Sequence, residues 1–165
     1  LIRASGVPYA LLRNTFYSEF IADQIGSALE HGALLTAAGA GRLATAARAD
    51  LAEAAAVVLS GEGHRNAVYE LTGAAAWTYD DLAAAVSRLS GRQIVHASVS
   101  DAELAATLAG AGLPAPVVEL LGGIHRGIRE GALARVSPDL GRLLGRAPLT
   151  IEQTIAQFLP AAQTA

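Results

Sequence analysis

The feature that most constrains the fold is a short apolar run at residues 7–13, entered through Gly6 and Pro8. A run of this length is too short for an ordinary helix and suits a strand buried on both faces. Residues 17–31 then carry apolar side chains at helical spacing and end at Gly32, a residue typical of helix ends. The chain therefore begins as strand, loop and helix, and we expect the strand to lie inside a parallel sheet.

Strand and helix patterns continue to alternate along the first part of the chain. Further strands are predicted at residues 33–36, 43–47, 67–71 and 93–99. Helices are predicted at residues 51–59, 78–89, 100–109, 116–130, 138–144 and 151–158. No repeat or linker divides the chain. We therefore predict an α/β fold, continuous over residues 1–165, that becomes mostly helical toward its end.

Residues that cap helices mark several of these starts. Asp50 is predicted to be the N-cap of the helix at 51–59, with Glu53 reaching back to it, and Thr150 is predicted to cap the last helix. Two capping boxes are predicted, in which the cap and the third helical residue bond to each other's backbone. They consist of Thr78 with Asp81 and of Ser100 with Glu103.

Composition and charge argue against several functions. Twelve basic and fifteen acidic residues give a net charge of −3 without a basic stripe, so we expect no nucleic-acid partner. No apolar run approaches the roughly 20 residues of a membrane span. The absence of cysteine excludes disulfides and thiolate metal sites and fits the reducing cytoplasm, and the four histidines lack ligand spacing. We expect no metal and no membrane partner.

The opening of the chain suggests that it is part of a larger protein. It contains no methionine, and its first residues, LIRASG, are typical of a helix end that leads into a loop. We expect an upstream part to precede Leu1.

The loop after the first strand is the main candidate for a binding site. Residues 13–18, RNTFYS, follow the carboxyl end of that strand, where open α/β sheets place ligands. An Asn carboxamide and backbone amides there suit a flat ring that bears an amide group, with Phe16 and Tyr17 beside it. Packing of the strand-to-helix corner explains both aromatic residues equally well. Arg48 also has two interpretations, a ligand contact or a surface residue beside Asp50.

Two glycine-rich stretches have simpler explanations than ligand binding. Gly39-Ala40-Gly41 lacks the third glycine of a dinucleotide fingerprint and does not open a helix after a strand, so we reject it as a phosphate loop. Residues 122–131 contain Gly122 and Gly123 within a predicted helix. Close helix packing or fraying explains such glycines more readily than a mobile cover over a pocket.

Six short motifs, in one order along nearly the whole chain, together resemble a known family. They are SGVPYALLRN (5–14), ALEHG (28–32), AAGAG (37–41), RAD (48–50), VYELTG (68–73) and LLGR (143–146). The set resembles the NmrA-like atypical short-chain dehydrogenase/reductases, and most closely the type-2 NAD(P)H:quinone oxidoreductases.

The resemblance implies a fold, a cofactor and a site. The fold would be the C-terminal part of a Rossmann-like NAD(P)-binding domain with a mostly helical substrate lobe, whose phosphate-binding half precedes Leu1. The cofactor would be NADP(H), with NAD(H) left open, and hydride would pass to a quinone-like acceptor. Asn14 would orient the reactants. The implied cofactor-binding residues are Arg13, Asn14, Thr15, Phe16, Tyr17, Ser18 and Arg48.

This chain departs from the family pattern at places that bear on the acceptor. Thr15, Phe16 and Phe20 replace a glycine, a tryptophan and an asparagine. His125, Arg126 and Arg135 occur in a stretch that tends to be acidic in the family. The runner-up function is a regulator that binds NADP and senses redox state without turnover. The sequence leaves both a monomer and a homo-oligomer open.

Overall fold

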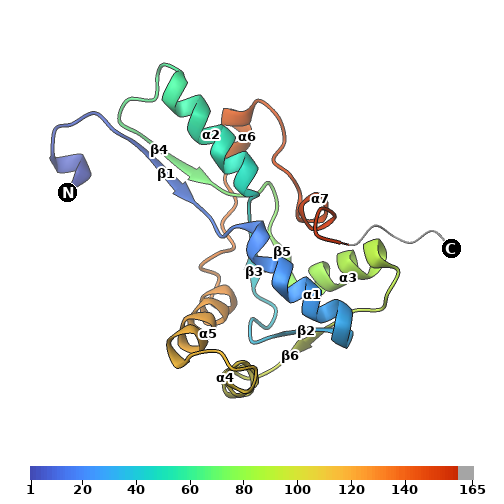
Figure 1. Ribbon diagram of the computed structural model, residues 1–165. Helices are drawn as coiled ribbons and strands as arrows, with labels where there is room; N and C mark the ends of the chain where they lie inside the picture. Colours follow the sequence, from blue (N-terminus) through green and yellow to red (C-terminus); the bar gives the residue numbers. More distant parts are fainter. Residues whose placement is uncertain (160–165) are drawn as a thin grey trace.

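Three short two-stranded sheets form the framework of the molecule (Figure 1). The computed structural model describes residues 1–159, apart from the side chain of Asp23. Two of the sheets are parallel and one is antiparallel. The parallel pairs are β1 (Ala10–Asn14) with β4 (Ala67–Leu71) and β2 (Ala33–Thr36) with β6 (Val95–Ser98), and the antiparallel pair is β3 (Arg42–Leu43) with β5 (Trp77–Thr78). The α/β class with parallel pairing is confirmed.

Helices occupy most of the remaining chain. They are α1 (Ala22–His31), α2 (Arg48–Ser60), α3 (Tyr79–Ser90), α4 (Asp101–Gly110), α5 (Ala115–Arg129), α6 (Asp139–Leu144) and α7 (Ile151–Ile155), with 3-10 turns η1 (Ile2–Ala4) and η2 (Ser18–Ile21). Within the described residues, no helix is long and apolar enough to cross a membrane.

The predicted helix ends are confirmed at most places. The capping boxes at Thr78 and Ser100 form, and Thr150 also caps its helix with help from Gln153. Gly32 ends α1 in the left-handed conformation, with φ of 78°. The last helix is shorter than predicted, because α7 stops at Ile155 and residues 156–158 form turns.

The predicted N-cap at Asp50 is wrong. Helix α2 begins at Arg48 after Ala47, whose side chain cannot cap it. Asp50 is instead fully buried in the first turn, and its carboxylate accepts hydrogen bonds from Arg146 at 2.8 Å and from the Leu149 backbone at 2.6 Å. A buried carboxylate needs such partners, so the contact with the distant chain decides its role.

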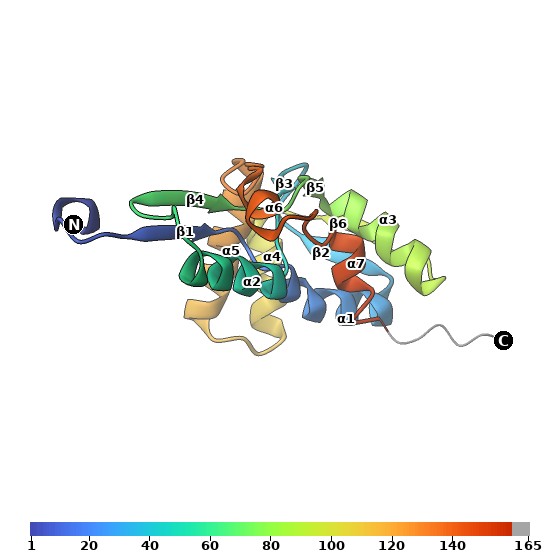
Figure 2. The same cartoon turned by 90° about the horizontal axis from the view of Figure 1, so that it is seen from above.

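The expectation that the first strand is buried on both faces is also wrong. Leu12 and Tyr69 lie opposite each other in β1 and β4 and belong to an apolar cluster with α2 and α6. Leu11 and its partner Val68 point to the other face and belong to neither buried cluster. Helices therefore cover one face of this pair, as Figure 2 shows for α2.

A second and larger apolar cluster lies around β2 and β6. Helix α1 contributes Ile25 and Ala28, and helix α3 contributes Leu82 and Val86, all of them almost completely buried. Burial of each large aliphatic side chain contributes about 1.5–3 kcal/mol to folding. This cluster fixes α1 and α3 and also includes Ile128 near the end of α5.

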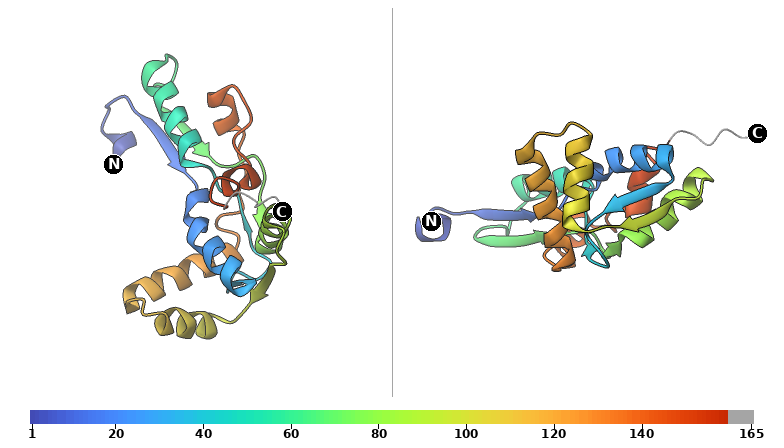
Figure 3. Two further views of the ribbon diagram at one scale, coloured as in Figure 1. Left: turned by 45° about the vertical axis from the view of Figure 1, so that its right-hand side comes forward. Right: turned by 90° about the horizontal axis from the view of Figure 1, so that it is seen from below.

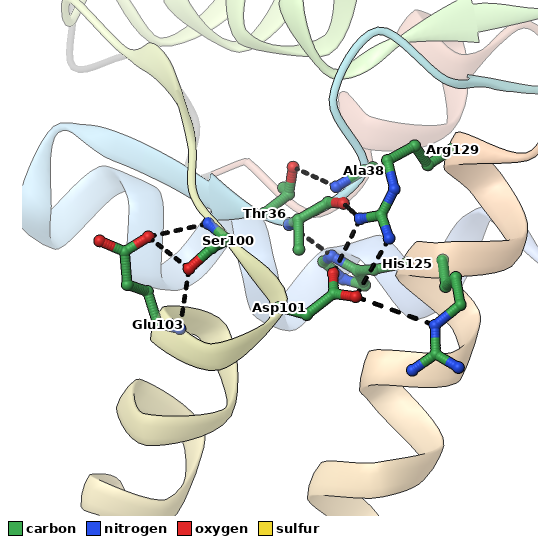
Figure 4. Close-up of polar contacts among 9 residues, drawn as sticks. Thr36, Ala38, Ser100, Asp101, Glu103, His125 and Arg129 are labelled. Carbon is green, nitrogen blue, oxygen red and sulfur yellow. Dashed lines mark hydrogen bonds and ion pairs between the residues drawn. The ribbon is translucent and has the colours of Figure 1, made fainter.

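Helices α4 and α5 form a hairpin at the opposite end of the molecule from α2 and α6 (Figure 3). The hairpin is fastened to the end of β2 by polar contacts (Figure 4). Arg129 binds Asp101 with both terminal guanidinium nitrogens and also donates to the Ala37 carbonyl, while the Ala37 amide donates to His125 Nδ1 at 2.9 Å. Helix α5 runs unbroken through Gly122 and Gly123, where an added Cβ would meet no atom within 4 Å. Close packing therefore does not explain these glycines.

Burial of His125 makes folding stability sensitive to pH. Desolvation lowers the pKa of His125 below its usual 6.5, in agreement with an unprotonated Nδ1 that accepts a hydrogen bond. The unfolded chain then binds a proton that the folded chain does not. Stability from this group is complete above pH of about 6.5 and is lost as the pH falls below it.

We expect the melting temperature of His125→Asn to fall less than that of the unmodified protein when the pH is lowered from about 7.5 to about 5.5. Asn can accept the same hydrogen bond but does not titrate. Thermal unfolding followed by circular dichroism measures this. His31→Asn, at an exposed position on α1, is the control and should keep the original slope. Equal slopes for all three proteins would contradict the assignment.

Candidate functional site

The carboxyl ends of β1 and β4 lie side by side and form one edge of a cleft. Parallel pairing places Asn14 opposite Leu71, and the Thr15 amide donates to the Leu71 carbonyl at 3.0 Å. This is the position at which open α/β sheets bind ligands. The cleft has a volume of about 300 Å³ and is lined by Arg13, Asn14, Thr15, Glu70, Thr72, Ala132, Leu133 and Arg135.

The segment between α5 and α6 supplies the third wall of the cleft, and hydrogen bonds hold it on both sides of Arg135. The Leu133 carbonyl accepts from the Ala44 amide at 2.8 Å, and the Ser137 amide donates to Thr72 Oγ1 at 2.8 Å. The segment is thus joined to the residue after β4 and to the residue after β3. Its course across the end of the sheet is fixed by these partners.

Charged groups converge at the mouth of the cleft. The Glu70 carboxylate lies 2.7 Å from the Arg13 guanidinium and 3.6 Å from that of Arg135. Glu70 is mostly buried, whereas both arginine side chains are more than half exposed. Two guanidinium groups therefore share one carboxylate, and the mouth of the cleft has a positive local charge.

Asn14 offers a polar group that the protein itself does not use. No backbone or side-chain group of the described residues forms a hydrogen bond with its carboxamide, which lies in the lining of the cleft. A carboxamide presents both donors and acceptors. It can therefore bind a ligand amide or a carbonyl oxygen.

The structure brings only part of the predicted site into this cleft. Arg13, Asn14 and Thr15 line it. Phe16 packs against the larger apolar cluster and Tyr17 against the smaller one. Ser18 is buried, and its hydroxyl donates to Thr45 Oγ1 at 2.9 Å. Packing of the corner, one of the two interpretations of the aromatic residues, thus occurs in the structure.

Arg48 lies in a separate group at the start of α2. Its backbone amide donates to the Glu19 carboxylate at 2.8 Å. Its guanidinium lies 6.0 Å from the Tyr17 ring and 5.6 Å from the Phe20 ring, within the range of cation–π attraction. Arg48 does not line the cleft, and its predicted contact with a cofactor stays a prediction.

The sequence interpretation did not assign Glu70, Thr72 or Arg135 to the site. A signal for the first two existed, because Glu70 lies near the end of the strand predicted at 67–71 and Thr72 follows it, and neighbouring parallel strands end at the same edge. For Arg135 the sequence showed only an unexpected basic residue. Its place in the cleft depends on hydrogen bonds to residues far away in the chain.

The glycine turn at residues 39–41 belongs to the packing of the molecule and does not line the cleft. Gly39-Ala40-Gly41 forms a turn packed against the end of α5, where a Cβ at Gly41 would collide with the Ile128 carbonyl. This turn is part of the core packing, which agrees with its rejection as a phosphate loop. The cleft itself, with a free carboxamide and backbone groups at strand ends, fits a flat ring that bears an amide.

Gly73 allows β4 to approach the residues after β3 and so supports the cleft. A Cβ at this position would collide with the Thr45 carbonyl. We expect Gly73→Ala to lower the free energy of unfolding by about 2 kcal/mol or more. In contrast, Gly123→Ala in the open middle of α5 should raise it by about 0.5–1 kcal/mol, since alanine favours helix. Chemical denaturation of both variants measures this, and a neutral Gly73→Ala would contradict the close approach.

Comparison with known proteins relates the chain to NAD(P)-dependent reductases. No family model matches the sequence. Quinone oxidoreductase 2 of Escherichia coli (strain K12) is 40% identical over 158 residues, which are 96% of this chain and 55% of that protein. The chain thus spans about half the length of the curated relatives it matches.

Solved structures give the same relationship. The NADPH-dependent quinone oxidoreductase from E. coli, complexed with NADPH, superposes with a TM-score of 0.90 at 40% identity over 94% of this chain and 55% of that one. The Citrobacter sp. triphenylmethane reductase, complexed with NADP(H), gives 0.91 at 38% identity over 96% and 55–56%. The expected resemblance and the NAD(P)-binding reductase fold are confirmed.

Proposed function

Because this chain is related over nearly its whole length to NAD(P)-dependent, NmrA-like reductases, we propose that it is the substrate side of an NADPH-dependent oxidoreductase that reduces a quinone-like acceptor. The observation that carries the proposal is the cleft at the ends of β1 and β4, with the unpaired Asn14 carboxamide in its lining. The 40% identity to a quinone oxidoreductase supports the choice of acceptor.

We further propose that residues 1–165 form the C-terminal portion of the NAD(P)-binding domain. The face of β1 and β4 with Leu11 and Val68 lies outside both apolar clusters of the described residues, as expected where further parts of a domain pack. The chain also matches about half the length of its relatives. The phosphate-binding half of the domain would cover the part of this face around Leu11 and Val68 and leave the cleft at its carboxyl end open.

The residues of the cleft would position the reactants and exclude water. When bound, the reduced nicotinamide would supply a hydride to the acceptor. Asn14 would hold the ring amide or the acceptor oxygen, Arg13 and Thr15 would border the ring, and Phe16, Tyr17 and Ser18 would fix the loop from behind. Arg48, held by Glu19 and near the Tyr17 ring, would also contact the cofactor. Orientation of bound reactants is a large part of such catalysis.

We expect Asn14→Ala to reduce kcat/KM for a benzoquinone by about tenfold in the full-length protein, because a hydrogen bond to the reactants is lost. The loss of NADPH absorbance measures turnover. Gln93→Ala removes an exposed amide outside the cleft and is the control. Unchanged kinetics of Asn14→Ala would contradict its positioning role, and tight NADPH binding without oxidation would favour a redox sensor over an enzyme.

Residues 1–165 alone should bind NADPH poorly. In the described part of the chain, no glycine-rich loop opens a helix toward the cleft, so the pyrophosphate lacks the helix N-terminus that usually anchors it. Calorimetry of the isolated chain should show no micromolar affinity, whereas the full-length protein should bind. Micromolar binding by the isolated chain would contradict the proposed division of the domain.

A further inference from the structure

We infer that Arg135 is a specificity-determining residue that favours acceptors with an acidic substituent, such as a sulfonate or carboxylate on the ring. The inference deepens the proposed function and rests on it, since it concerns the acceptor that enters the same cleft. It follows from three features of the structure: an excess of positive charge, a fixed backbone around Arg135, and the engagement of the neighbouring basic side chains elsewhere.

The charge in the cleft is not balanced. Glu70 is the only carboxylate in the described lining, and Arg13 and Arg135 both face it. Asp139 lies nearby, but one of its oxygens accepts from the Glu70 amide at 2.9 Å and the other is 3.2 Å from Arg142. Arg13 takes the closer position on Glu70, at 2.7 Å against 3.6 Å. The Arg135 guanidinium therefore has donors left for an anion.

The backbone around Arg135 is held in place even though its side chain is 69% exposed. Hydrogen bonds fasten the segment at Leu133 and Ser137, two residues to either side. The segment also turns on itself, since the Ala134 amide donates to the Gly131 carbonyl at 3.2 Å. A guanidinium presented from a fixed backbone matches the flat, two-oxygen geometry of a sulfonate or carboxylate.

The other basic residues of this region are engaged in structural contacts. His125 is buried and accepts a backbone hydrogen bond. Arg126 and Arg129 both pair with Asp101 at the base of the hairpin, as Figure 4 shows for Arg129. None of the three lines the cleft. Among the described basic residues at 125–135, Arg135 is thus the one that lines the cleft.

The test compares naphthoquinone with its ring sulfonate as acceptors for the full-length protein with NADPH. We expect Arg135→Gln to raise KM for the sulfonate about three- to fivefold, the size of an exposed ion pair, and to leave KM for naphthoquinone and kcat for both within about twofold. Arg135→Lys should recover part of the effect. High salt should reduce the difference between the unmodified protein and Arg135→Gln.

Matched controls separate this role from others. Arg142→Gln removes the same charge from α6, outside the cleft, and should not alter the selectivity. Fluorescence titration with naphthalene sulfonate, which cannot be reduced, should show the same loss of affinity in Arg135→Gln without turnover.

Two results would overturn the inference. One is a raised KM for NADPH with unchanged acceptor selectivity, which would place Arg135 on a cofactor phosphate. The other is a lowered melting temperature with unchanged selectivity, which would make it a tether of the segment. Failure of the unmodified protein to reduce either quinone would instead reject the proposed function itself.

Discussion

The parallel pairing of β1 with β4 is the constraint on which the site depends. It brings Arg13, Asn14 and Thr15 next to Glu70 and Thr72, although more than fifty residues separate the two strands along the chain. Parallel neighbours must be joined by a crossover, and α2 lies within this connection on the face that carries Leu12 and Tyr69. The opposite face carries Leu11 and Val68 and, nearer its carboxyl end, Arg13 and Glu70 beside the cleft.

Close approach between backbone segments positions the other walls of the cleft against β1 and β4. Gly73 lets the end of β4 pass against Thr45, and Gly41 lets the turn after β2 pass against the end of α5. The segment that carries Arg135 is fastened between these two regions through Ala44 and Thr72. The wall of the cleft is therefore built from core packing, and its charged side chains are presented from a fixed backbone.

Local rules predicted the secondary structure well where the signal lies within a few residues. The capping boxes at Thr78 and Ser100 need only neighbours in the sequence, and both form. Prediction was wrong where partners are distant. Asp50 is a residue type that often caps helices, but it binds Arg146 and Leu149. The apolar run at residues 7–13 is half-buried or exposed, because no part of the described chain covers its second face.

The sequence by itself determined the α/β class, most helix ends and the family resemblance, and it made the loop at residues 13–18 the candidate site, because periodicity, capping and motif order are local. The tertiary structure decided how that loop divides. Arg13, Asn14 and Thr15 reach the cleft, Phe16 and Ser18 enter the packing, and Arg48 joins Glu19. It also added Arg135. These assignments depend on which distant backbones meet, and a linear pattern carries no record of those distances.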